Sequence, residues 1–319
     1  MRRSSSLLTA AAALTTTAMA MTAIPAGAAD APAPRATAGT QVPVFAGPLG
    51  GTPSLVADGD AGRAAPASKF VVTYTGFTPE AKAAFQRAVT MWQSKLSSPV
   101  PITVKASWEP LGSGVLGSAG PSYVWDVNGV LYADAVANKK SGKQLHAAPD
   151  IVARFSSNFS NWHFGTGPAP AGKYDFTSVV AHELGHGVGF FGAGRVSGST
   201  GSVRINGKNV SYDRYTKLGA NASSPLLWKM PDNSTQLGSA LRSNNVYFDA
   251  PGVRSANGGK AAKLYAPGTW RQGSSYSHLD EATFPKGSPN SLMTYAIGGG
   301  ETIRTPGNLG MAVLKAVGW

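Results

Sequence analysis

The sequence of 319 residues contains no cysteine, which excludes disulfide bonds, thiolate metal sites and a cysteine nucleophile. Charged residues are also scarce, at 14% of the chain, and only five residues are histidines. Any metal must therefore be held by His, Asp or Glu side chains. Basic residues outnumber acidic ones by 28 to 16, but they are scattered along the chain, which argues against a nucleic-acid partner.

Long apolar runs are missing beyond the first residues of the chain. Residues 1–29 combine two basic residues, Arg2 and Arg3, with an apolar run and a cluster of small residues, and this order predicts a secretory signal peptide. No later stretch approaches the roughly 20 apolar residues that a membrane span needs. We therefore expect a secreted, extracellular protein with no stable membrane anchor after signal cleavage.

The segment after the signal peptide, residues 30–68, is rich in Ala, Pro and Gly and lacks apolar periodicity. This composition predicts a flexible leader or a short pro-segment, with the folded domain spanning residues 69–319. A helix is expected after Thr78, because an N-cap residue is followed there by Pro79 at the first helical position. Strands are expected at residues 69–74, 102–106, 130–133 and 151–155, and a closing helix at 308–317.

A second helix, beginning near Asp175, carries the sequence His182-Glu183-Leu184-Gly185-His186. Two histidines four positions apart on a helix project from one face and can bind the same ion. Glu183 lies about 100° around the helix from His182, where it can activate a water molecule without becoming a ligand. Because the helix is apolar, burying these polar groups without a partner is unfavourable, and a divalent cation supplies that partner.

The continuation of this motif to Gly189 resembles the metzincin zinc-peptidase motif H-E-x-x-H-x-x-G-x-x-H. In that family the glycine makes the turn that ends the helix, and the resemblance assigns this role to Gly189. The sequence departs from the family at the position of the third histidine, where it has Gly192. The third ligand is therefore either absent or contributed from elsewhere in the chain.

Among the remaining histidines, His278 is the best candidate for the third ligand, because a catalytic zinc needs three protein ligands and an open position. His163 is interpreted as part of an aromatic cluster and His146 as a loop residue, while Asp213 is the main alternative ligand. A long insertion before His278, with Met293 shortly after it, is similar to leishmanolysin. The segment around Met293 resembles the methionine turn that lies beneath the zinc in metzincins.

The resemblance also suggests roles for three further side chains and for the leader. Tyr295 stands where astacins and serralysins present a tyrosine to the metal, so it is a candidate for stabilising negative charge in the reaction. Asp280 or Glu281 is expected to orient His278. The segment Asp58-Gly59-Asp60 in the leader is a candidate source of a blocking carboxylate, as aspartates are in astacin pro-segments, with a solvated linker turn as the alternative; whether the leader confers latency stays open.

Together these observations predict an α+β, metzincin-like catalytic domain. Its N-terminal lobe, residues 69–190, would hold a twisted sheet with two helices, and its C-terminal lobe, residues 191–319, would be irregular and end in a helix. The expected function is zinc-dependent endopeptidase activity on protein or peptide substrates, with one catalytic zinc; calcium sites cannot be predicted. The alternatives are a secreted adhesion or polymer-binding protein that contains zinc, and a zinc amidohydrolase acting on non-peptide substrates.

Overall fold

The computed structural model describes residues 36–50, 52–58 and 67–319, so the predicted signal peptide lies outside the described residues. The fold is mixed α+β, which confirms the predicted class. One unit, Pro34–Trp319, contains all the elements described below. Among the described residues, no helix combines the length and the apolar character that crossing a membrane requires.

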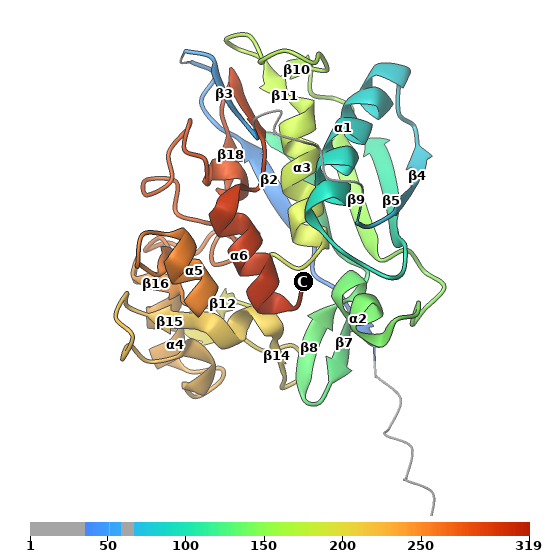
Figure 1. Ribbon diagram of the computed structural model, residues 1–319. Coiled ribbons are helices and arrows are strands. Elements are labelled where there is room, and N and C mark those ends of the chain that lie inside the picture. Colours follow the sequence, from blue (N-terminus) through green and yellow to red (C-terminus); the bar gives the residue numbers. More distant parts are fainter. Residues whose placement is uncertain (1–35, 51, 59–66) are drawn as a thin grey trace, which may run out of the picture. The chain divides into compact units, whose positions relative to one another are not determined.

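A six-stranded sheet forms the centre of this unit, in the order β18-β2-β6-β9-β5-β4 (Figure 1). Three strands confirm the sequence prediction and run parallel to one another: β4 (Phe70–Thr75), β5 (Ile102–Glu109) and β9 (Ile151–Ser156). Strand β6 (Val115–Pro121) runs antiparallel to β9. Alternate residues of β5 are buried, which is the pattern of a strand with one face on the core.

Two helices lie side by side against this sheet, as expected from the sequence (Figure 1). Helix α1 (Pro79–Lys95) begins where the Thr78 hydroxyl accepts a hydrogen bond from the Ala81 amide. Helix α3 (Phe176–Gly187) carries the histidine motif and is buried along its whole length. The indole of Trp92 on α1 donates to the Ala181 carbonyl on α3 at 2.9 Å, which ties the two helices together.

The expectation that the folded part begins near Lys69 is wrong. The leader forms three strands: β1 (Ala36–Ala38), β2 (Val42–Ala46) and β3 (Ser54–Ala57). Strand β2 enters the central sheet between β6 and β18 (Ala296–Ile297), while β1 pairs with β7 (Tyr123–Val127) and β3 with β19 (Glu301–Arg304). The residues that bring β2 into the core are Val42 and Val44, which are 2% and 0% exposed.

Shorter elements surround the central sheet and helices. Before α3 these are β7 (Tyr123–Val127), β8 (Val130–Ala133), α2 (Asp134–Ser141), β10 (Trp162–His163) and β11 (Tyr174–Asp175). After α3 they are β12 (Arg195–Ser197), β13 (Thr200–Ser202), β14 (Asn209–Val210), η1 (Ser211–Tyr215), β15 (Thr216–Leu218), η2 (Leu227–Lys229), α4 (Thr235–Leu241), β16 (Val246–Phe248), α5 (Pro251–Ala256), β17 (Ala262–Lys263), η3 (Ser291–Met293) and β19 (Glu301–Arg304). The chain ends with helix α6 (Gly307–Val317), close to the predicted closing helix.

Candidate metal centre

Helix α3 ends in a tight turn that begins directly after His186. The amide of Gly189 donates to the His186 carbonyl, and the amide of Phe190 donates to the Gly185 carbonyl, each at 3.0 Å. This pair of bonds is a Schellman motif, which needs a left-handed residue just after the helix. Gly189 has φ +116°, a backbone conformation that residues other than glycine rarely adopt. The turn places the Phe190 carbonyl beside the imidazole of His186.

The structure brings His182, His186 and His278 together. The Nε2 atom of His186 lies 2.9 Å from that of His182 and 3.1 Å from that of His278, and the third pair of Nε2 atoms is 3.2 Å apart. All three side chains are 0% exposed. One nitrogen of each ring therefore points to a common centre, and these three buried histidines lie close enough to bind one metal ion.

Main-chain carbonyls fix the orientation of all three rings. The Nδ1 atom of His182 lies 2.6 Å from the Leu292 carbonyl oxygen, that of His186 lies 2.6 Å from the Phe190 oxygen, and that of His278 lies 2.8 Å from the Ser274 oxygen. A carbonyl can only accept, so Nδ1 carries the proton in each ring. The three Nε2 lone pairs then converge without a proton between them, which is the arrangement of neutral imidazoles around a cation.

Burial also favours the neutral form of the three imidazoles. It lowers the pKa of His182 from 6.5 to about 4, with the Leu292 carbonyl opposing the shift. Burial likewise lowers the pKa of His186 and His278 well below the usual value, and the other histidines of the cluster lower them further. Metal ligation requires deprotonated imidazole, so the environment prepares these residues for that role.

Glu183 lies beside the histidines with both carboxylate oxygens buried. Its Oε1 atom accepts a hydrogen bond from the Val44 amide at 3.2 Å. Within the described part of the chain, its Oε2 atom is buried without a hydrogen-bond partner. Burial raises the pKa of Glu183 well above 4.5, against the main-chain hydrogen bonds from Val44 and Ala119. An unpartnered carboxylate oxygen of this kind needs a water molecule, a substrate or a cation to satisfy it.

Met293 packs against α3 at Gly185, the residue that precedes His186. A Cβ atom placed on Gly185 would lie 2.7 Å from the Met293 sulfur, so a side chain at this position would require the methionine to move. The neighbouring residue, Leu292, supplies the carbonyl that orients His182. The η3 turn thus contacts α3 through Met293 and orients His182 through the Leu292 carbonyl.

Gly192 cannot be replaced by a histidine ligand in this structure. A Cβ atom at this position would lie 2.3 Å from the Tyr276 ring and 2.7 Å from Asp213 Oδ1. Asp213 itself is engaged elsewhere, because it accepts hydrogen bonds from the amides of Ala193 and Val210 and from the Tyr276 hydroxyl. The alternative of Asp213 as third ligand is therefore not supported, and the third imidazole comes from His278.

The other predicted side chains have different partners. The Tyr295 ring stacks on Tyr265, with centroids 4.1 Å apart. His163 lies 3.1 Å from the Gly167 carbonyl oxygen, and His146 packs against Tyr123.

Neither acidic residue that was expected to orient His278 does so. Asp280 accepts hydrogen bonds from the amide and the hydroxyl of Thr283. The pKa of Glu281 is raised to about 7 by burial and by the nearby carboxyl groups of Glu301 and Asp280. The partner of His278 Nδ1 is the Ser274 carbonyl, since the chain folds back over four residues to reach the ring.

Two contributions to the site were missed in the sequence. The carbonyls of Leu292, Phe190 and Ser274 have no sequence signature, because every residue carries one. Val44 had a weak signature: the β-branched residues Val42 and Val44 alternate within an otherwise Ala-, Pro- and Gly-rich leader.

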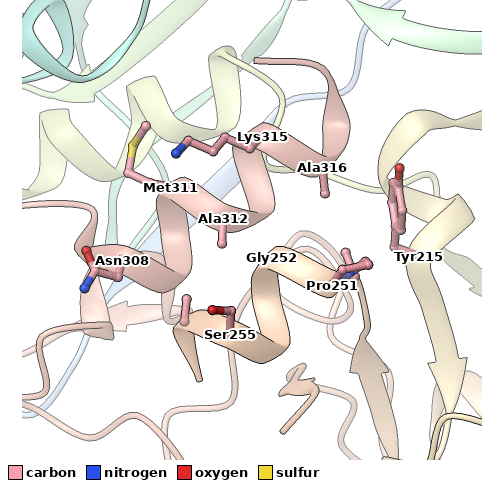
Figure 2. A pocket seen from close by; sticks show the side chains of 11 residues that line it. Tyr215, Pro251, Gly252, Ser255, Asn308, Met311, Ala312, Lys315 and Ala316 are labelled. Atoms are coloured by element: carbon pink, nitrogen blue, oxygen red, sulfur yellow. The ribbon is translucent and has the colours of Figure 1, made fainter. Parts of the chain in front are cut away.

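A separate cavity of about 600 Å³ lies between α5 and α6, where Tyr215, Pro251 and Lys315 are among the lining residues (Figure 2). None of the predicted site residues lines it. The candidate site is therefore the cluster of His182, His186 and His278.

Comparison with models of known protein families, with curated proteins and with solved structures finds no match for this chain.

Proposed function

We propose that this protein is a secreted, zinc-dependent endopeptidase. The observation that carries the proposal is the convergence of three neutral, carbonyl-oriented imidazoles beside a buried carboxylate, that of Glu183, whose Oε2 atom has no hydrogen-bond partner among the described residues. Three nitrogen ligands and an open fourth position are the usual donor set of a catalytic zinc. A structural zinc site would be expected to fill all four positions with protein ligands.

The residues of the site have separate tasks in this proposal. His182, His186 and His278 would hold the ion. When bound, zinc polarises a carbonyl oxygen and makes water more acidic. Glu183 would accept the proton of the attacking water on its free Oε2 atom and pass it to the leaving amine of the peptide. The carbonyls behind the three rings keep the imidazoles in position during these steps.

We further propose that the domain has the two-lobed metzincin architecture. Three features support this assignment: the turn at Gly189 that ends the motif helix, the packing of Met293 against Gly185, and a third histidine from the C-terminal part of the chain. The long connection between Gly192 and His278 is the feature shared with leishmanolysin. Tyr295 stays a proposed stabiliser of negative charge, and its ring stacks on that of Tyr265.

Peptide-bond hydrolysis by the zinc-loaded protein tests the proposal, with a mixed peptide library as substrate and mass spectrometry as the readout. The wild-type chain is compared with Glu183→Gln, each with and without a chelator. We expect new peptide termini only for the wild type with zinc, and each sample is measured before and after a cut in the leader, residues 30–68. Equal cleavage by Glu183→Gln would contradict the role of the carboxylate. Zinc binding without hydrolysis, also after the leader has been opened, would favour a binding protein or a different hydrolase.

A further inference from the structure

The leader strand β2 lies between two separate parts of the chain. On one side it pairs antiparallel with β6, with Val42 opposite Ala119 and Val44 opposite Gly117. On the other side it pairs in parallel with β18, which directly follows the η3 turn beneath the histidines. In Figure 1 these partners, β2 in blue and β18 in red, lie side by side although they come from opposite ends of the sequence.

Main-chain hydrogen bonds hold β2 on both of these sides. The Ala46 amide donates to the Gly114 carbonyl at 2.8 Å on the side of β6. The Phe45 amide donates to the Tyr295 carbonyl at 3.3 Å, and the Gly47 amide to the Ile297 carbonyl at 2.8 Å, on the side of β18. An extended peptide of almost any sequence can form this set of bonds, because they involve the backbone alone.

The middle of β2 crosses the candidate active site. The Val44 amide donates a hydrogen bond to Glu183 Oε1, and the Val44 side chain is 0% exposed. With β2 in place, Glu183 and all three histidines are also 0% exposed. A peptide bond cannot reach the histidine cluster in this arrangement, and one oxygen of the proposed base is already engaged.

We propose that β2 occupies the position of an extended peptide substrate and keeps the enzyme latent until the leader is released. This inference rests on the proposed function and adds its regulation. A substrate would replace β2 by forming the same backbone bonds with β6 and β18, and its scissile bond would then lie beside Glu183. The latency device is thus a main-chain strand.

Of the two predicted blocking carboxylates, Asp60 lies outside the described residues and Asp58 does not take part in this device. Asp58 lies 2.7 Å from the Lys95 ammonium and accepts a hydrogen bond from Thr305, so it anchors the end of the leader.

An open groove flanks β2 and gives it a route of release. The groove has a volume of about 440 Å³ and is lined by Gln41, which precedes β2, and Pro43 of β2, together with residues of β6 and the loop before His278. A Cβ atom on Gly273 in this loop would lie 2.5 Å from the Pro43 ring, so the loop holds the strand closely. We expect that cutting the leader after β2 allows the strand to leave through this groove.

The test is a cut made after folding, so that no variant has to fold without β2. The recognition sequence of a site-specific protease is inserted between Leu49 and Gly50, where Leu49 is 55% exposed. A matched control carries the same insertion between Ala222 and Ser223, in an exposed loop after β15. Both proteins are purified, loaded with zinc and then cut.

Two rates are measured before and after cutting: removal of zinc by an excess of chelator, and hydrolysis of a fluorogenic peptide mixture. Cutting after Leu49 should raise both rates at least tenfold, whereas the control cut should leave them unchanged. A synthetic peptide with the sequence of residues 41–47 should restore the low rates. If β2 stays bound after the cut, the substitution Val44→Asp is added to weaken its binding, because it places a carboxylate at a buried position beside Glu183. Leu55→Asp, in the exposed part of β3, is the control for this substitution.

The outcomes separate the two proposals. If neither rate changes after the cut, even with Val44→Asp, β2 is a permanent part of the fold and the latency proposal is overturned. Hydrolysis by the uncut chain at the final rate would also overturn it, while supporting the peptidase. If chelator access rises at least tenfold but no peptide is hydrolysed, β2 covers the site as proposed and the assignment as a peptidase fails.

Discussion

The Nε2 atoms of His186 and His278 lie 3.1 Å apart, although 92 positions separate the two residues in the chain. The packing of the long connection between them brings the third imidazole to the helix. Tyr276 contributes to this packing. Its hydroxyl donates to Asp213, and its backbone adopts φ +75° two residues before His278. The metal centre thus depends on the packing of the C-terminal part of the chain.

Replacing His278 should remove the metal. His278→Ala leaves two imidazoles, so we expect loss of at least 100-fold in zinc affinity, because a three-ligand site becomes a two-ligand site. His163→Ala is the matched control, since its ring contacts the Gly167 carbonyl and lies outside the cluster. Native mass spectrometry gives the zinc content of each variant. Full zinc content in His278→Ala would show that this residue is not a ligand.

Replacing Glu183 should separate metal binding from catalysis. Glu183→Gln keeps the size of the side chain and an oxygen that can accept from the Val44 amide, but it removes the base. We expect unchanged zinc content and a loss of hydrolysis of about 10²–10⁴-fold, the usual contribution of general acid–base catalysis. The comparison uses chains with an opened leader. Loss of zinc in this variant would instead indicate that the carboxylate is a ligand.

Gly192 should not tolerate a side chain. In Gly192→Ala the added carbon would meet the Tyr276 ring at 2.3 Å, so we expect the free energy of unfolding to fall by about 1–3 kcal/mol. Because Tyr276 lies two residues before His278, zinc affinity should fall as well. Gly167→Ala, where nothing lies within 4 Å of the added carbon, is the control and should change stability by less than about 0.5 kcal/mol. Urea denaturation of both variants provides the comparison, and equal stabilities would refute the tight packing at Gly192.

Asp134 should make stability depend on pH. Burial and the nearby Asp150 raise the pKa of Asp134 from 3.8 to about 7, against hydrogen bonds from Trp125 and Asn138. At a pH between these two pKa values, Asp134 holds a proton in the folded chain that it has lost in the unfolded chain, so the free energy of unfolding decreases as pH rises. Asp134→Asn removes this dependence. As pH rises from 4 to 8, the free energy of unfolding of the variant should increase by about 1–3 kcal/mol relative to that of the wild type. The interaction of Asp134 with Asp150 limits the size of this difference. An unchanged difference between wild type and variant across this range would contradict the account.

The helices and the parallel strands could be predicted from the sequence because their signals are local. Thr78 and Pro79 mark the start of α1, and the apolar residues of α3 repeat with the helical period. The histidine motif was visible for the same reason, since both ligands lie one turn apart. His278 could be proposed because only two other histidines, His146 and His163, lie outside the helix motif.

The strands of the leader could not be predicted from the sequence. Its Ala-, Pro- and Gly-rich composition favours a flexible segment, and the alternation of Val42 and Val44 is too short to indicate a strand. Val42 and Val44 form only two buried positions, with Pro43 between them, and their partners Ala119 and Gly117 lie more than 70 residues away. The orientation of the imidazoles was equally hidden. It depends on carbonyls such as that of Ser274, whose position follows from the backbone path and from no side chain.

X-ray absorption at the zinc K-edge of the zinc-loaded protein tests the central claim, a three-histidine metal centre. We expect one zinc per chain with three imidazole nitrogens at about 2.0–2.1 Å and an additional oxygen ligand that is not from the protein. A spectrum with only two imidazoles and a carboxylate, or a protein that binds no zinc, would contradict the assignment of His182, His186 and His278.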